Sequence, residues 1–377
     1  MDVDATDQHS KTGPLAGITV VELAAYLSAP FAAMMLADLG ATVIKVEPPR
    51  GDPFRRFQGG GAMSPQFANI NRNKQGVVAD LKTPEGVDRV LELVETADIF
   101  LANWRPDTGA RLGLGDDVLA ARNQRLIRCY VSGFGSDGPS ASRPAYDSIA
   151  QAASGLTWSW TDGDEPTLAA NYLADTVTAS MTAQSMLAAV IARDRSGVGE
   201  RVDVAMVDAF AYFNSSAAMA HRVYLDHIDP DAVPNTTPTR PVQALDGWLV
   251  ISVVTRKQID AAFEAIGRPE QVEALIAEHG VRNLSDPMLD ALEVGTRSKS
   301  VDHWVAEFTA RDVPHEPCFT VDQHLASDYA ADAELYSEHV WPDIGRVRQI
   351  RHPARFTSWP TLGHRSPPPP APPRPKR

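Results

Sequence analysis

Between residues 18 and 132, short β-branched runs alternate with segments of helical periodicity. Four runs predict strands, the first of them a buried one: GITVVELA, ATVIKVE, DIFLAN and LIRCYV. APFAAMMLADLG and TPEGVDRVLELVETA predict helices, and we expect Gly40 to end the first and Thr83 to cap the second. Strands that alternate with helices predict a parallel sheet with crossover helices, so the expected fold class is α/β with a Rossmann-like large domain.

Composition divides the chain into two domains and two flexible terminal segments. Residues 1–13 predict a flexible tail, and residues 14–224 predict the large domain, which contains a long small-residue helix from Ala174 to Ala192. DPDAVPNTTPTRP predicts a linker, and the segments after it predict a smaller α/β domain over 225–325. We expect residues 326–363 to return to the large domain and the proline-rich residues 364–377 to be disordered.

Charge and cysteine content restrict the partners and the compartment. The net charge of −13 argues against nucleic acid or an anionic membrane as the main partner, although a few local cations can still hold an anionic ligand. No apolar run approaches the ~20 residues that cross a bilayer, and the acidic start MDVDATDQHSKTG is not a secretory signal. Cys129 and Cys318 cannot build a disulfide framework, and no H-x-x-x-H or C-x-x-C spacing indicates a metal site. We therefore expect a cytoplasmic protein without a metal.

The stretch CYVSGFGSDGPSASRPAYD spells Gly133-x-Gly135-x-x-Gly138 after a predicted strand, as a dinucleotide-binding turn does. In such a turn the third glycine opens a helix whose N-terminus faces the pyrophosphate. Pro139 and Pro144 follow Gly138 and disfavour a helix. We interpret the stretch as a glycine-rich loop at the C-terminal end of a strand, where an open α/β sheet binds ligands, and keep NAD binding as an alternative.

Seven motifs follow one another in an order that resembles the class III CoA-transferases (CaiB/BaiF type), the group around formyl-CoA, carnitine and succinyl-CoA transferases. They are GITVVELAAYLSAPFAAMMLADLGATVIKVEPPRGDPFR, NRNKQGVVADLKTPEG, ANWRPDTGARLGLG, CYVSGFGSDGP, PAYDSIAQAASGL, YLADTVTASMTAQSMLAAVIAR and GVGERVDVAMVDA. The resemblance is strong from about residue 15 to 215 and weaker to about 360. It implies an enzyme that moves CoA from an acyl-CoA thioester to a free carboxylic acid, with CoA as substrate and no permanently bound cofactor. It also implies an interlocked homodimer.

The resemblance assigns Asp175 as the catalytic nucleophile. Its carboxylate would attack the thioester carbonyl to give a mixed anhydride and CoA thiolate. The thiolate would then form an aspartyl-CoA thioester, or wait while the acceptor acid attacks. Asp175 precedes a helical segment, where helix amides favour a charged carboxylate, although an aspartate there is also an ordinary N-cap.

The resemblance also implies residues that bind CoA. They are Leu27, Ser28, Ala79, Leu81, Lys82, Asn103, Trp104, Arg111, Arg143, Tyr146 and Met206. Arg111 is expected to meet the phosphates, Lys82 to lie at the adenine end and Met206 to pack at the cofactor. Solvated positions for the two cations and core packing for the methionine are the alternatives. The backbone amides of Gly133 and Gly135 are candidate donors to the thioester oxygen.

Four features depart from the family pattern. Leu27 stands where several transferases carry a glutamine, and Pro48 stands where the formyl-CoA enzyme has an arginine for CoA. Arg50, Arg55 or Arg56 could compensate for that loss of charge. No poly-glycine lid is found between residues 225 and 260, which argues against oxalate as the acceptor, and a proline tail replaces the terminal helix.

Two alternative functions stay open. The α-methylacyl-CoA racemases use a histidine before the aspartate of G-H-D, but this chain has Tyr146 there, and a tyrosine is a poor second base near neutral pH. A non-catalytic CoA-binding protein is the other alternative, because Leu27 and Pro48 depart from the pattern. The acyl donor and acceptor are not specified, and we expect specificity to depend on residues around 27–31, 55–67 and 230–245.

Overall fold

The structure is a computed structural model that describes residues 12–57, 63–159, 164–219, 222–226, 240–280, 284–342, 344–359 and 363–369. The chain divides into two compact units, one comprising Met1–Val223 and Glu334–Arg377 and the other Tyr224–Ala333. Three parts of the expected tails and linker, residues 1–11, 227–239 and 370–377, lie outside the described residues.

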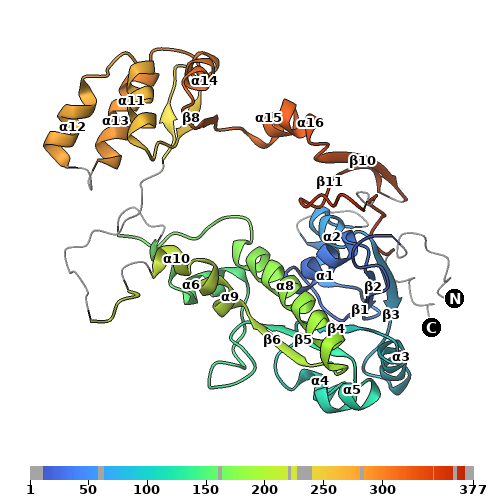
Figure 1. Ribbon diagram of the computed structural model, residues 1–377. Helices are drawn as coiled ribbons and strands as arrows, with labels where there is room; N and C mark the ends of the chain where they lie inside the picture. The colour runs from blue at the N-terminus through green and yellow to red at the C-terminus, as the bar shows by residue number, and fades with distance from the viewer. Residues whose placement is uncertain are drawn as a thin grey trace. The chain divides into compact units, whose positions relative to one another are not determined.

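A six-stranded parallel sheet forms the centre of the larger unit (Figure 1). Its spatial order is β3-β2-β1-β4-β5-β6, the doubly wound order in which the progress of the chain reverses between β1 and β4. The strands are β1 (Thr19–Glu22), β2 (Thr42–Glu47), β3 (Lys74–Val78), β4 (Ile99–Ala102), β5 (Ile127–Ser132) and β6 (Arg201–Ala205). The predicted α/β class with a parallel sheet is confirmed, and a ligand is expected at the carboxyl ends of β1 and β4.

Helices cover both faces of this sheet. Alternate strand residues face opposite sides, so Val20 packs with α1 and α8, whereas Val21 packs with α3 and α5. Thr83 caps α3 as predicted, because its hydroxyl accepts from the Gly86 N–H at 3.2 Å. The helices of this unit are α1 (Ser28–Asp38), α2 (Pro65–Ile70), α3 (Pro84–Val94), α4 (Thr108–Arg111), α5 (Asp116–Arg122), α6 (Asp147–Ala153), α7 (Leu156–Ser159), α8 (Leu173–Ser196), α9 (Met206–Phe213), α10 (Ser215–Ala218) and the 3-10 helix η2 (Pro53–Arg56). No helix among the described ranges is long and apolar enough to span a bilayer.

The smaller unit is built on a three-stranded antiparallel sheet. Its strands are β7 (Val242–Gln243), β8 (Trp248–Ile251) and β9 (His315–Pro317). Its helices are α11 (Arg256–Ala265), α12 (Gln271–His279), α13 (Ser285–Thr296), α14 (Val301–Ala310), α15 (Val321–Leu325) and α16 (Asp328–Asp332). The side chains of Phe263, Leu292 and Phe308 are fully buried in its core, and each contributes about 1.5–3 kcal/mol by leaving water.

The chain then returns to the larger unit through an antiparallel hairpin, β10 (Tyr336–Trp341) and β11 (Gly345–Ile350). Residues 363–369 pack against the start of β3, where the Arg365 N–H donates to Asn73 Oδ1 at 2.7 Å. A Cβ added at Gly76 would lie 2.6 Å from the Cβ of Pro368. These contacts differ from the expectation that the chain is disordered from residue 364, because buried backbone and side-chain partners hold the first prolines of the tail.

Candidate active site

A cavity of about 310 Å³ opens at the carboxyl ends of β1, β4 and β5, where the doubly wound order reverses. We call it the strand-end cavity. Residues that follow β1 form one wall, and residues that follow β4 form another. The first wall contains Leu23 and residues 25–28, and the second contains residues 103–105. Ligand sites of open α/β sheets lie at this position because the loops after neighbouring strands diverge there.

Asn103 joins the two strand ends that border the strand-end cavity. Its side-chain Nδ2 donates to the Ala25 carbonyl at 2.7 Å, and the Ala25 N–H donates to Asn103 Oδ1 at 3.0 Å. The amide side chain thus replaces a pair of backbone hydrogen bonds between β1 and β4. It fixes the loop that leads from β1 into α1.

Asp175 is the third residue of α8, and its side chain lines the strand-end cavity. The Ser28 hydroxyl donates to Asp175 Oδ1. The Asp175 backbone N–H donates to Oδ1 of Asp147 at 3.0 Å, so a carboxylate from α6 caps this helix. Gln151 donates to the other oxygen of Asp147 at 2.6 Å and is itself held by two bonds to Ala169. The nucleophile candidate therefore has a fixed position.

Burial raises the pKa of the Asp175 carboxyl to about 6, and the negative charge of Asp147 adds to the rise. The hydroxyl and N–H of Ser28 oppose it by stabilising the ionised form. The sequence-based expectation that the helix N-terminus keeps this carboxylate charged holds only in part, because desolvation outweighs the helix amides. At pH 7 a group with this pKa is still ionised in about nine of ten molecules.

Strained backbone borders Asp175 on both sides. Asn171 and Tyr172 have left-handed φ angles of 68° and 55° immediately before α8, and Tyr26 has a φ of 64° before α1. A tyrosine in this conformation costs about 1–2 kcal/mol, whereas an asparagine adopts it more readily. The Tyr26 N–H donates to Asp52 Oδ1 at 3.2 Å, which helps to hold the strained residue in place.

A buried ionic cluster anchors Asp52. The ammonium group of Lys45 contacts Asp52 at 3.0 Å and Glu22 at 2.8 Å, and it donates to the Ala24 carbonyl at 2.9 Å. Lys74 contacts the other oxygen of Glu22 at 2.7 Å, and burial lowers its pKa to about 8. The cluster lies beneath the loop that carries Tyr26 and positions it.

A second cavity, of about 440 Å³, also has Asp175 in its lining. We call it the aromatic cavity, because five rings line it: Tyr26, Phe54, Phe57, Tyr146 and Tyr172. Leu27, Asp147, Ser148 and Asp175 complete its described lining. Tyr26, Leu27, Tyr146 and Asp175 line both cavities, so the carboxylate stands at their junction. Among the described residues no histidine lines either cavity, so the second base of the racemase alternative has no candidate there.

The structure brings most of the predicted site residues together. Asp175 and seven of the eleven predicted CoA-binding residues line the strand-end cavity: Leu27, Ser28, Asn103, Trp104, Arg143, Tyr146 and Met206. Gly133 lines it too, and a Cβ there would lie 2.3 Å from the Cβ of Ala145, so a glycine lets the two loops approach. After Gly138 the next helix is α6, so the glycine stretch opens no helix of its own.

Four predicted residues do not line the cavity: Ala79, Leu81, Lys82 and Arg111. Ala79 is buried in the core beside Leu81, and Lys82 is exposed after β3. Arg111 is exposed on α4 and donates to the Thr108 hydroxyl at 3.1 Å. Their roles at the adenine and phosphate end of CoA stay predictions.

Sequence reasoning missed Arg105, which lines the strand-end cavity directly after Asn103 and Trp104. The sequence could have indicated Arg105, because a cation that follows a central parallel strand lies where ligands bind. Arg55, in contrast, cannot replace the arginine missing at Pro48. It is buried and paired with Glu47 through two contacts of 2.7 and 2.5 Å.

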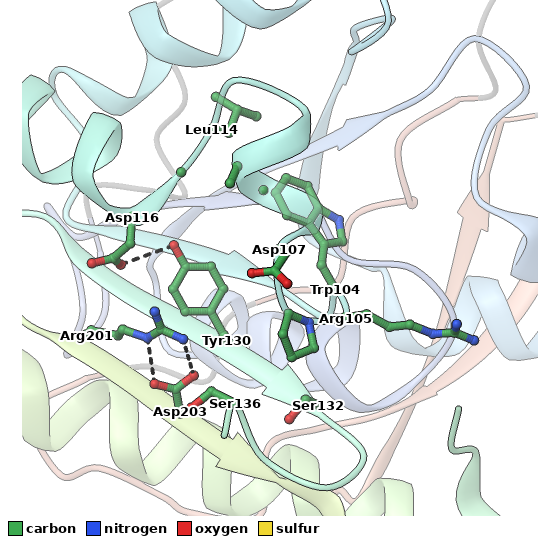
Figure 2. Close-up of a pocket in the computed structure, with 14 residues that line it drawn as sticks. Trp104, Arg105, Asp107, Leu114, Asp116, Tyr130, Ser132, Ser136, Arg201 and Asp203 are labelled. Carbon is green, nitrogen blue, oxygen red and sulfur yellow. Dashed lines mark hydrogen bonds and ion pairs between the residues drawn. The ribbon is translucent and has the colours of Figure 1, made fainter. Parts of the chain in front are cut away.

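Arg105 also borders a smaller hollow of about 140 Å³ (Figure 2). There the Tyr130 hydroxyl donates to Asp116 at 3.3 Å, and the Arg201 guanidinium lies 5.0 Å from the centre of the Tyr130 ring. Arg201 is in turn paired with Asp203 at 2.7 Å. Figure 2 shows Arg105 extending away from this group, in which Arg201 is paired with Asp203, and Asp116 is paired with Arg128 at 2.9 Å.

Fold and site together define an α/β protein with a cavity at the switch point of a parallel sheet, beside a desolvated carboxylate. Residues 15–371 match the model of CoA-transferase family III, and the chain belongs to this family of enzymes, which use acyl-CoA substrates.

Relatives support the assignment along nearly the whole chain. The probable fatty acyl-CoA transferase Rv3272 of Mycobacterium tuberculosis is 33% identical over 92% of each chain. A crystal structure of Rv3272 superposes with a TM-score of 0.82 at 31% identity, covering 94% of this chain and 96% of the other. The succinate–glutarate CoA-transferase of Agrobacterium fabrum is 38% identical over 66% of this chain and 65% of its own.

Proposed function

We propose that this enzyme transfers CoA from an acyl-CoA thioester to a free carboxylic acid, with Asp175 as the nucleophile. The position of the Asp175 carboxylate, at the junction of the strand-end cavity and the aromatic cavity, carries this proposal. A thioester sulfur in one cavity and its acyl group in the other would place the thioester carbonyl beside the carboxylate. Family membership supports the same reaction class.

The steps follow from the properties of a carboxylate nucleophile. Oδ2 of Asp175 attacks the thioester carbonyl while Ser28 holds Oδ1, and the carbon–sulfur bond breaks to give a mixed anhydride and CoA thiolate. The thiolate attacks the aspartyl carbonyl, so the first acid leaves and an aspartyl-CoA thioester forms. The acceptor carboxylate attacks this thioester and displaces the CoA thiolate, which gives a second mixed anhydride. The thiolate then attacks the acceptor's carbonyl, so the Asp175 carboxylate leaves and the new acyl-CoA forms.

The lining of the strand-end cavity suits CoA. Arg105 and Arg143 are cations at its wall, and guanidinium groups pair well with phosphates. Asn103 and Trp104 line the same cavity, in which the pantetheine arm would pass. The Gly133 amide is our candidate donor to the oxygen of the tetrahedral intermediate.

A thioester exchange assay tests the proposal. The enzyme is incubated with acyl-CoA donors and free acids, and new acyl-CoA species are measured by mass spectrometry. Asp175→Ala is expected to abolish exchange and retain CoA binding. Asp302→Ala, an exposed aspartate in the first turn of α14, is the matched control and is expected to keep full activity. A covalent CoA adduct on Asp175 during turnover is the second expected result, and normal exchange by Asp175→Ala would exclude the mechanism.

We also propose that two copies form an interlocked homodimer, as the family resemblance implies. Sedimentation at micromolar concentration is expected to show a dimer. Folded monomers under these conditions would contradict this part of the proposal.

A further inference from the structure

The aromatic cavity presents an apolar surface to whatever lies beyond the Asp175 carboxylate. Its rings contact one another in sequence, with centroid distances of 5.8 Å for Tyr26–Tyr146, 6.4 Å for Tyr26–Phe54, 5.1 Å for Phe54–Phe57 and 6.3 Å for Phe57–Tyr172. Rings at these distances form a continuous wall. An acyl group bound to Asp175 would therefore enter an apolar environment.

The charged residues that the described lining of this cavity contains are of one sign. Asp147 and Asp175 are its charged lining residues among those the structure describes, and no lysine or arginine joins them. The neighbouring Arg55 is buried against the Phe67 ring at 4.0 Å and paired with Glu47. A second carboxylate at the far end of a substrate would find no cation here and would be repelled by Asp147.

The volume of the cavity sets the size of the group that fits. An engineered apolar cavity of about 150 Å³ holds a benzene molecule. The aromatic cavity, at about 440 Å³, is roughly three times larger. It therefore has room for an aryl ring with a short linker, or for an alkyl chain of medium length.

We propose that the enzyme acts on apolar monocarboxylic acids, aryl-alkanoic or medium-chain alkanoic, whose hydrocarbon part occupies the aromatic cavity while CoA occupies the strand-end cavity. This inference rests on the proposed function and names its substrate class. It separates this chain from a relative such as the succinate–glutarate CoA-transferase of Agrobacterium, which is named for two dicarboxylates.

Hexanoate and adipate form a matched pair for the test, because they differ by one terminal carboxylate. With one acyl-CoA donor, kcat/KM for hexanoate and for 3-phenylpropanoate is expected to exceed that for adipate about 100-fold or more, since an unpaired carboxylate is costly in an apolar pocket. Equal or faster exchange with adipate would overturn the substrate class and leave the CoA-transferase function intact. No exchange with any acid would contradict the proposed function itself.

Phe57→Arg tests the assignment of the cavity. Phe57 lines the aromatic cavity and does not line the strand-end cavity. An arginine there supplies the missing cation, so the hexanoate-to-adipate preference is expected to fall at least about ten-fold. Phe57→Leu, which keeps an apolar side chain, is expected to retain the preference. Phe319→Arg, at an exposed phenylalanine of the smaller unit, is the control for the added charge and is expected to leave it unchanged.

A loss of CoA binding in Phe57→Arg, with the acid preference unchanged, would overturn the proposal, because it would assign this cavity to the coenzyme. CoA affinity is measured by calorimetry for the wild-type enzyme and each variant. The expected outcome is a CoA affinity within about two-fold of wild type, since Phe57 does not line the strand-end cavity.

Discussion

The pH dependence of the first chemical step reports directly on Asp175. If its ionised carboxylate attacks the thioester, the rate falls below a pKa of about 6. Two neighbours move this pKa in opposite directions. The Ser28 hydroxyl stabilises the charged form, whereas the charge of Asp147 destabilises it. Ser28→Ala should therefore shift the acidic limb of the pH–rate profile, where the rate falls with falling pH, to higher pH. Asp147→Asn should shift this limb to lower pH.

The sizes of the two shifts follow from the contacts. A hydrogen bond to a charged group is worth about 1.5–3 kcal/mol, and one pKa unit corresponds to 1.36 kcal/mol, so losing the Ser28 hydroxyl predicts a rise of about one unit after water partly replaces it. At pH 6 the ionised fraction of Asp175 would fall from about one half to about one tenth. The Asp147 effect is the smaller of the two, and a fall of about half a unit would raise the ionised fraction at pH 5 from about one tenth to about one quarter.

The acidic limb is measured as the single-turnover rate of CoA thiol release from an acyl-CoA between pH 4.5 and 8. Single turnover keeps product release from hiding the chemical step. The asparagine in Asp147→Asn still offers an oxygen to the Asp175 N–H, so α8 keeps its cap. The asparagine loses the hydrogen bond from Gln151, so the unfolding of the Asp147→Asn variant is measured in parallel. Shifts of both variants in the same direction, or a limb that neither variant moves, would refute the assignment of this limb to Asp175.

Three further predictions concern stability and the loops of the site. The Asp175 carboxyl has a pKa of 3.8 in the unfolded chain and about 6 in the folded one, so the folded protein loses stability as pH rises through that window. Asp175→Asn should therefore raise the free energy of unfolding by up to about 3 kcal/mol at pH 8 and by much less at pH 4. Thermal melts at the two pH values measure this difference. Lys45→Met leaves Glu22 buried with less compensation and should cost about 3–5 kcal/mol in denaturant unfolding; a cost below about 1 kcal/mol would contradict the role given to the cluster. Gly133→Ala should lower kcat/KM for acyl-CoA at least about ten-fold, because the new Cβ would meet Ala145 at 2.3 Å; unchanged steady-state kinetics would show that the loops separate without consequence.

The strands that the sequence predicts are those with both faces buried. β1, β2, β4 and β5 are runs of mainly apolar residues, and each appears where it was expected. β3 was missed, because its sequence KQGVV begins with a lysine and contains a glycine. Lys74 is buried there because Glu22 of β1 balances its charge and because Pro30 and Asn71 accept hydrogen bonds from its ammonium group. No local pattern reveals a charge partner as distant in the chain as Glu22.

The site was predictable where it follows the ends of strands or an ordered motif. Asn103 and Trp104 follow β4, and Asp175 follows the family pattern. The cap on Asp175 by Asp147 was not predictable, since it joins two helices across 28 residues. The rings at Phe54 and Phe57 lie in the breaker-rich PPRGDPFRRF, where periodicity carries no information about which side chains face inward.

The left-handed backbone at Tyr26 and Tyr172 limits which lining residues of the aromatic cavity can be replaced in enzyme engineering. Only glycine, asparagine or aspartate would tolerate those φ angles well, and none of them would replace a ring. Phe57 has an ordinary φ of −74°, and Phe54 lies in a 3-10 helix that most residues can adopt. A library of variants for acids with longer or branched chains should therefore vary Phe54 and Phe57 and keep Tyr26 and Tyr172.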